Sequence, residues 1–464
     1  MISCSATPRK AKRALWLLAA TLLAVPAMAD AQVLTLRDAL RRADQAGFAN
    51  RIAAGQSAAQ AGQGLAPYRG ILPTIRMETS YLATTDPLNA FGFALRQRAV
   101  TPAAFAPSSL NNPNAIGNLT TGVVVEQPLF NADSWLGRKA AATASQATAA
   151  QERWTRSGTA VDVVRAYWGA VLSREQEHML RSALEAAQSH VRQAESLVRQ
   201  GMATRSDALL ASVKAGQVEA ALLSARSQVR LARLGLALLM GEPAESTFAL
   251  PGVLPSAEQV QFVSSRATTE NMLPVRRADV EAATLARDAA VADARRASAL
   301  YLPRLNGFGR LDWNAPTAPF GGKSAWTLGL MLSWSPFAGA SELAEIRTAS
   351  GRRRTAVAMA EAAEATAGLD RSRTTDAVPL AQARLEIAGR GIAQASEAHR
   401  IVGRKYEGGL ASVTELLDAA AIETTAELAE VAARYELIVA TAESRRAQGL
   451  DLSPLQDLEP LVNQ

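Results

Sequence analysis

Apolar or small residues spaced three and four positions apart mark two long stretches of the chain. The first stretch has them at Ala208, Ala211, Ala215, Val218, Leu222, Ala225, Val229, Ala232, Leu236 and Leu239. The second stretch has them at Leu417, Ala421, Thr424, Leu428, Val431, Tyr435 and Ile438. This heptad-like spacing predicts long helices that pack as coiled coils, and the alanines permit close approach of the helices.

The segments before these two rows are also expected to be helical. Residues 131–200 contain no proline, so a continuous helix there would extend about 105 Å at ~1.5 Å per residue. A comparable segment follows Phe337. Pro379 is expected to kink or interrupt it, because proline lacks the N–H that a helix interior uses. The pattern therefore predicts a long helical hairpin twice.

A pattern of period two precedes each helical hairpin. In "SAWTLGLMLSW" the apolar face is formed by Trp326, Leu328, Leu330, Leu332 and Trp334. The period predicts a strand, and its length is near the ~9–11 residues that a tilted strand needs to cross a bilayer. A soluble sandwich is the alternative, but its outer face would normally be polar. Tryptophans at both ends of an apolar face fit a membrane barrel better, with the face toward lipid.

Weaker alternation in "TIRMETSYL", "LTTGVVVEQ" and "RLNGFGRLDW" predicts three more strands, and hence one β-hairpin in each half. The first hairpin encloses a long loop, residues 86–117. "VVVEQPLF" (123–130) returns as "MLSWSPFA" (331–338), and "GMATRSDALL" (201–210) returns as "GLASVTELLD" (409–418), both after 208 residues. Duplication at such a long period indicates two homologous halves.

These repeats divide the chain into five parts. The expected order is a signal peptide at 1–29, a first repeat at 30–241, an irregular linker at 242–271, a second repeat at 272–449 and a tail at 450–464. In the first repeat the β-hairpin spans about 73–127 and the helical hairpin about 131–241. In the second repeat they span about 303–335 and about 337–449.

The first 29 residues have the features of a secretory signal, with a basic segment, an apolar segment and a small-x-small ending at Ala29. Cleavage after Ala31 fits as well, and a membrane anchor is the alternative to a signal. The signal carries four of the six net positive charges, so the remaining charge predicts no nucleic-acid partner. Cys4 is the only cysteine, so no disulfide, thiol ligand or lipid attachment is expected in the mature chain. No later segment has the apolar length of a transmembrane helix.

Nothing in the sequence indicates an enzyme. It contains no Gly-rich phosphate loop and no cysteine nucleophile, and the histidines are His178, His190 and His399, none of them four residues apart. A zinc site would need ligands that are more closely clustered. We therefore predict a protein without catalytic residues, cofactor or metal.

The repeated decapeptide is a helix start. Thr204 and Asp207, and Ser412 and Glu415, have the spacing of a capping box. The preceding glycine permits the positive φ that often ends a helix. Each motif is thus expected to form a tight turn at the far end of a helical hairpin.

The order of these elements and their duplication resemble the TolC-like outer-membrane channels of export systems, over nearly the whole mature chain. The resemblance implies an α+β membrane protein: a trimeric twelve-stranded β-barrel continued by a periplasmic α-helical coiled-coil barrel. It implies a passive exit duct of a tripartite efflux or type I secretion system, with residues 242–271 and the tail in an equatorial belt. A periplasmic coiled-coil adaptor or structural protein is the alternative. It accounts for the heptads but not for four amphipathic strands.

The resemblance also assigns residues. An adaptor protein, which couples the channel to an inner-membrane pump, would dock at Gly201, Met202, Thr204, Ser206, Asp207, Gly409, Leu410, Ser412 and Thr414. Glu415 and Asp418 match the acidic constriction, although Asp418 can equally be a solvated charge. Two features depart from the family pattern: the tyrosine of "RKYEGG" has no counterpart in "SLVRQG", and Pro67 falls where the first helix usually continues. The sequence names neither the substrate nor the pump.

Overall fold

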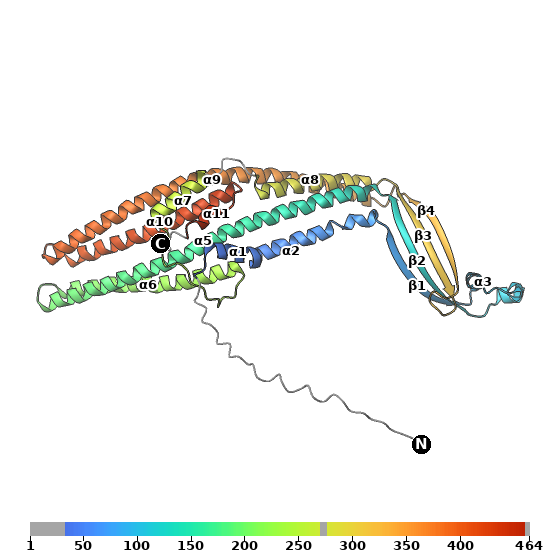
Figure 1. Cartoon of the computed structure of the whole chain (residues 1–464), viewed down its shortest axis with the longest axis horizontal. Helices are drawn as coiled ribbons and strands as arrows, with labels where there is room; N and C mark the ends of the chain where they lie inside the picture. Colours follow the sequence, from blue (N-terminus) through green and yellow to red (C-terminus); the bar gives the residue numbers. More distant parts are fainter. Residues whose placement is uncertain (1–32, 270–275, 460–464) are drawn as a thin grey trace, which may run out of the picture.

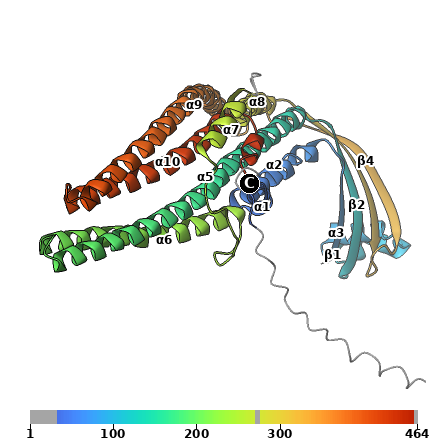
Figure 2. The same ribbon diagram turned by 60° about the vertical axis from the view of Figure 1, so that its left-hand side comes forward.

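The computed structural model describes residues 33–269 and 276–459, so the signal peptide expected at 1–29 lies outside the described residues. The molecule is elongated, with long helices at one end and a curved β-sheet at the other (Figure 1). The turns of both long helical hairpins lie at the end opposite to the sheet (Figure 2). No helix within the described ranges is both long and apolar enough to span a bilayer.

Two helical hairpins form most of the molecule. The first consists of α5 (Ala132–Arg199) and α6 (Arg205–Met240), and the second of α9 (Ser341–Glu407) and α10 (Val413–Ala447). Shorter helices precede each hairpin: α1 (Leu36–Ala46), α2 (Phe48–Gln63) and the 3-10 helix η1 (Ala66–Gly70) in the first half, and α8 (Ala278–Ala299) in the second. Both α2 with η1 and α8 pack on α5.

Pro379 was expected to kink or interrupt the second long helix, and the structure has no interruption there, because α9 continues through Pro379. Proline removes one hydrogen bond from the helix. The neighbouring side chains Val378, Ala381 and Leu385 are buried in the core, and this packing holds the segment helical.

The sheet has four antiparallel strands in the order β1-β2-β3-β4. Their bounds are β1 Thr74–Thr84, β2 Ile116–Phe130, β3 Arg304–Ala315 and β4 Lys323–Ser333. Strand β2 pairs with β3, so one sheet joins the two repeats. Strands β1 and β4 are its edges.

The loop between β1 and β2 is more structured than the sequence suggested. It contains α3 (Pro87–Arg96), the 3-10 turn η2 (Pro102–Phe105) and α4 (Pro107–Asn111). Asp86 caps α3 by accepting a hydrogen bond from the backbone N–H of Asn89, and a proline occupies the first helical position. Both features start helices.

The segment after α6, expected to be irregular, contains α7 (Ala257–Thr269). Val260, Val263 and Ala267 are spaced three and four apart and are buried where α7 packs on α10. Helix α11 (Ser453–Gln456) lies beside it. The main hydrophobic core includes side chains of α7 and α11 together with the fully buried Tyr167 and Trp168 of α5.

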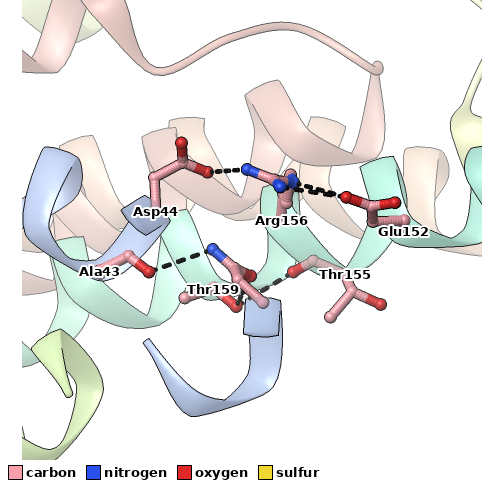
Figure 3. A network of polar contacts seen from close by, with 7 residues as sticks. Ala43, Asp44, Glu152, Thr155, Arg156 and Thr159 are labelled. Atoms are coloured by element: carbon pink, nitrogen blue, oxygen red, sulfur yellow. Dashed lines mark hydrogen bonds and ion pairs between the residues drawn. The ribbon is translucent and has the colours of Figure 1, made fainter. Parts of the chain in front are cut away.

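A polar network attaches the first two helices to α5 (Figure 3). Arg156 donates to Asp44 at 2.6 Å and to Glu152 at 3.0 Å. The buried Thr159 hydroxyl donates to Asn50 at 2.9 Å, and Asn50 donates to the carbonyl of Ala43 at 3.2 Å. Because these buried polar groups have hydrogen-bond partners, the helices pack closely at little desolvation cost.

Candidate functional site

The two tip turns have the same geometry. Thr204 and Ser412 accept hydrogen bonds from the backbone N–H groups of Asp207 and Glu415, at 3.3 and 3.2 Å. The two acids accept in return from the backbone N–H groups of Thr204 and Ser412, at 3.0 and 2.7 Å. The preceding glycine has φ +73° at Gly201 and +71° in the second turn. Both capping boxes expected from the sequence are therefore formed.

The turns expose a matched pair of apolar side chains. Met202 and Leu410 occupy equivalent positions of the two repeats and are 65% and 83% exposed. Thr204, Ser206, Ser412 and Thr414 are exposed as well. Each hairpin thus presents one exposed apolar residue among hydroxyl groups at its turn.

The Glu415 carboxylate is hydrogen-bonded within its own turn. Its carboxylate accepts from the Ser412 backbone, and this hydrogen bond, together with the Ser412 hydroxyl and the nearby Lys405, lowers its pKa. The side chain is charged and faces solvent, but one of its oxygens is engaged in capping.

Asp418, three residues further on, pairs with a residue that sequence reasoning missed. Its Oδ1 lies 3.2 Å from Nζ of Lys214 on α6. The repeat places Leu210 opposite Asp418 and Ile422 opposite Lys214, so the duplication carries no sign of the pair. The ion pair links the two helical hairpins and halves the unpaired charge of the expected acidic constriction.

A small apolar cluster also links the hairpins at this level. Ala194 of α5, Ala211 of α6 and Val413 and Leu417 of α10 are buried together, and Tyr406 packs against them. Burial and the charge of the nearby Asp207 raise the pKa of Tyr406. Tyr406, which has no counterpart in the first repeat, thus lies at the contact between the two tips.

Two histidines from different hairpins lie close together. The rings of His190 on α5 and His399 on α9 have centroids 6.4 Å apart, and Nδ1 of His399 contacts a carboxylate oxygen of Glu423 on α10. Burial and the neighbouring His399 lower the pKa of His190. No sequence pattern pairs residues so far apart in the chain. Among the described residues, no group of three or more His, Cys, Asp or Glu is placed to hold a metal ion.

The sheet has one apolar and one polar face. Trp326, Leu328 and Leu330 lie opposite Leu311, Gly309 and Gly307 in the β3–β4 register, so all six share one face. The five side chains from Trp326 to Trp334 that the sequence placed toward lipid are each at least 62% exposed.

The other face of the sheet carries charged and amide side chains. Arg76 pairs with Glu126 at 3.3 Å, Asn306 donates to Glu126 at 2.9 Å, and Arg310 donates to Asp312 at 2.7 Å. These polar contacts cross β1, β2 and β3. Such a division suits a sheet with lipid on one side and water on the other.

The sequence matches the family model described as outer membrane efflux protein over residues 88–242 and 271–449, well over half of the chain. No curated protein is similar enough in sequence to match it.

Solved structures of outer-membrane proteins are similar in fold. VceC of Vibrio cholerae is 18% identical with a TM-score of 0.73, covering 89% of this chain and 96% of that chain. The CmeC channel of Campylobacter jejuni is 14% identical with a TM-score of 0.72, covering 92% and 89%. The MtrE channel of Neisseria gonorrhoeae, in its open state, is 18% identical with a TM-score of 0.69, covering 90% and 89%.

Proposed function

Because this chain belongs to the outer membrane efflux protein family, we propose that it is the passive exit duct of a tripartite efflux or type I secretion system. The observation that carries the proposal is the four-stranded sheet, apolar on one face and polar on the other, continued by two long helical hairpins. The sheet lies in the outer membrane, and the helices extend into the periplasm.

Three chains close the channel. Among the residues that the structure describes, the edge strands β1 and β4 have no partner on their outer sides. Unpaired backbone groups are not tolerated in lipid, so β1 of one chain pairs with β4 of the next. Three chains with four strands each make a twelve-stranded barrel, and the polar sheet face lines its water-filled interior.

The tips dock a periplasmic adaptor, which couples the duct to an inner-membrane pump. Met202 and Leu410 supply apolar contacts, and the hydroxyl groups around them supply hydrogen bonds. Binding energy at interfaces is concentrated in a few apolar anchors surrounded by polar groups. At the tips, Met202 and Leu410 would be the apolar anchors, and the hydroxyl groups around them would be the polar surroundings.

The tips also form the gate. Glu415 and Asp418 lie on one face of α10 near its start, and three copies of each would surround a narrow entrance. Asp418 is held by Lys214 in this structure. The gate therefore combines a ring of capping carboxylates with an ion pair that joins the two hairpins of one subunit.

Thiol crosslinking in isolated outer membranes tests both the location and the trimer. Cys4, in the proposed signal peptide, is the only natural cysteine. Any crosslink in the mature protein would therefore come from the introduced thiols. A Ser80→Cys, Thr327→Cys variant carries one thiol on the polar face of each edge strand and should give dimers and trimers with a bis-maleimide. Each single variant is the control and should give no trimer. A protein found in the soluble periplasmic fraction, or a double variant that stays monomeric, would refute the duct.

A further inference from the structure

Aromatic side chains gather where the sheet joins the helices. Tyr68 precedes β1, Trp135 follows β2, Tyr301 precedes β3 and Trp334 follows β4. Trp135 stacks edge-to-face on Phe130 with ring centroids 5.7 Å apart. The indole N–H of Trp334 donates to the carbonyl of Tyr301 at 3.1 Å. Each strand thus ends beside an aromatic residue at the same boundary, as expected at a membrane–water interface.

One part of this boundary is hollowed. A cavity of about 430 Å³ is lined by Tyr68 and Ile71 from the segment before β1 and by Trp135 and Arg138 from the first turns of α5. Three of these four side chains are apolar or aromatic, and the fourth is a cation. The exposed Leu72 continues the apolar surface next to Ile71.

The cation of this cavity is uncompensated. The Arg138 guanidinium has no hydrogen-bond or ion-pair partner in the part of the chain that the structure describes. The nearest acid in sequence, Asp133, is already engaged by Arg304 at 3.1 Å. A guanidinium binds a phosphate group through two parallel hydrogen bonds, which makes an anionic oxygen pair its natural partner.

We propose that the cavity of Tyr68, Ile71, Trp135 and Arg138 binds one anionic phospholipid of the periplasmic leaflet. The phosphate pairs with Arg138, and the start of an acyl chain lies against Trp135 and Ile71. A free phosphate ion would use only the arginine and would leave the apolar walls empty. Charge complementarity and continuity with the apolar sheet face both favour the lipid. The proposal rests on the membrane placement of the sheet under the proposed function.

Native mass spectrometry of the purified protein in detergent tests the site, with phosphatidylglycerol and phosphatidylcholine as probes. The wild type should bind phosphatidylglycerol more tightly than phosphatidylcholine. Arg138→Gln should weaken phosphatidylglycerol binding by about tenfold, the equivalent of one charge-assisted hydrogen-bond pair, and should abolish the preference. Trp135→Ala should weaken both lipids, whereas Trp135→Phe should retain most of the binding.

Arg69→Gln is the matched control. Arg69 is exposed on η1, the 3-10 helix that carries Tyr68, but it does not line the cavity. This variant should bind like the wild type. Equal loss in Arg69→Gln and Arg138→Gln would mean non-specific charge attraction and would overturn the site. Displacement of the lipid by millimolar inorganic phosphate would make it an anion site instead.

The same spectra report the oligomer, which separates this proposal from the proposed function. A trimer without bound lipid would refute the lipid site and leave the duct standing. If Arg138→Gln dissociates the lipid-free trimer, a second copy of the chain covers the cavity and the lipid is excluded.

Discussion

Lys214 on α6 and Asp418 on α10 form an ion pair with 3.2 Å between Nζ and Oδ1, and this pair joins the two helical hairpins close to their tips. The side chains are 34% and 55% exposed. Exposed ion pairs contribute about 0–1 kcal/mol to stability. The pair therefore matters more for the charge at the entrance than for the fold.

This relationship predicts opposite effects of two substitutions. Lys214→Gln should raise cation selectivity in planar-bilayer recordings, because it frees the Asp418 carboxylate. Asp418→Asn should lower selectivity and weaken block by divalent cations. Thermal stability should change by no more than about 1 kcal/mol in either variant. Unchanged selectivity in both variants, correctly assembled, would place the pair outside the pore.

Two substitutions in the second tip turn should distinguish the effect of helix capping from the effect of charge. Ser412→Ala should destabilise the protein by about 1 kcal/mol, because it removes the hydroxyl that caps α10. Glu415→Gln should keep most of the stability, since glutamine also completes a capping box, but should lower cation selectivity. Thermal unfolding and bilayer recordings on both variants check this. A selectivity change in Ser412→Ala alone would argue that turn geometry, not charge, sets the gate.

Acid should loosen the contact between the hairpins. The pKa of His190 is lowered by burial and by His399, so the folded state resists protonating it. Below about pH 6.5 the unfolded chain takes up this proton more readily, and stability falls until the pH passes the lowered folded pKa. The wild type should lose more stability between pH 7 and pH 5 than His190→Gln does. Equal losses would exclude His190 as the cause.

The apolar anchors of the tips should decide adaptor binding. Met202→Asp with Leu410→Asp should abolish co-purification of the adaptor, because both side chains project from the turns. Met359→Asp is a suitable control, since Met359 is 63% exposed on α9, far from the turn in sequence. Retained adaptor in the tip variant, or its equal loss in the control, would contradict docking at the tips.

The two faces of β4 should differ in their tolerance of charge. Leu328→Arg should cost about 2–4 kcal/mol near the bilayer midplane and impair outer-membrane assembly. Ala325→Arg should assemble, because position 325 lies on the other face, opposite Asp312. Leu328→Met controls for the loss of the leucine itself. Assembly yield measures all three, and equal yields from the two arginine variants would reverse the assignment of faces.

Much of the local structure follows from the sequence. The hydroxyl of Ser412 and the carboxylate of Glu415 are three residues apart, so a single helical turn brings them together wherever the helix lies. The alternation from Trp326 to Trp334 likewise assigns one strand face without knowledge of its neighbours. These features depend on periods of two and 3.6 residues and on short-range hydrogen bonds.

The tertiary structure decided what joins distant segments. Helix α9 continues through Pro379 because buried neighbours hold it, and the pairs Lys214–Asp418 and His190–His399 form because two separate hairpins pack side by side. The members of each pair are about two hundred residues apart, and no local period connects them. Their proximity depends on the rotation and offset of one hairpin against the other, which packing of the whole chain sets.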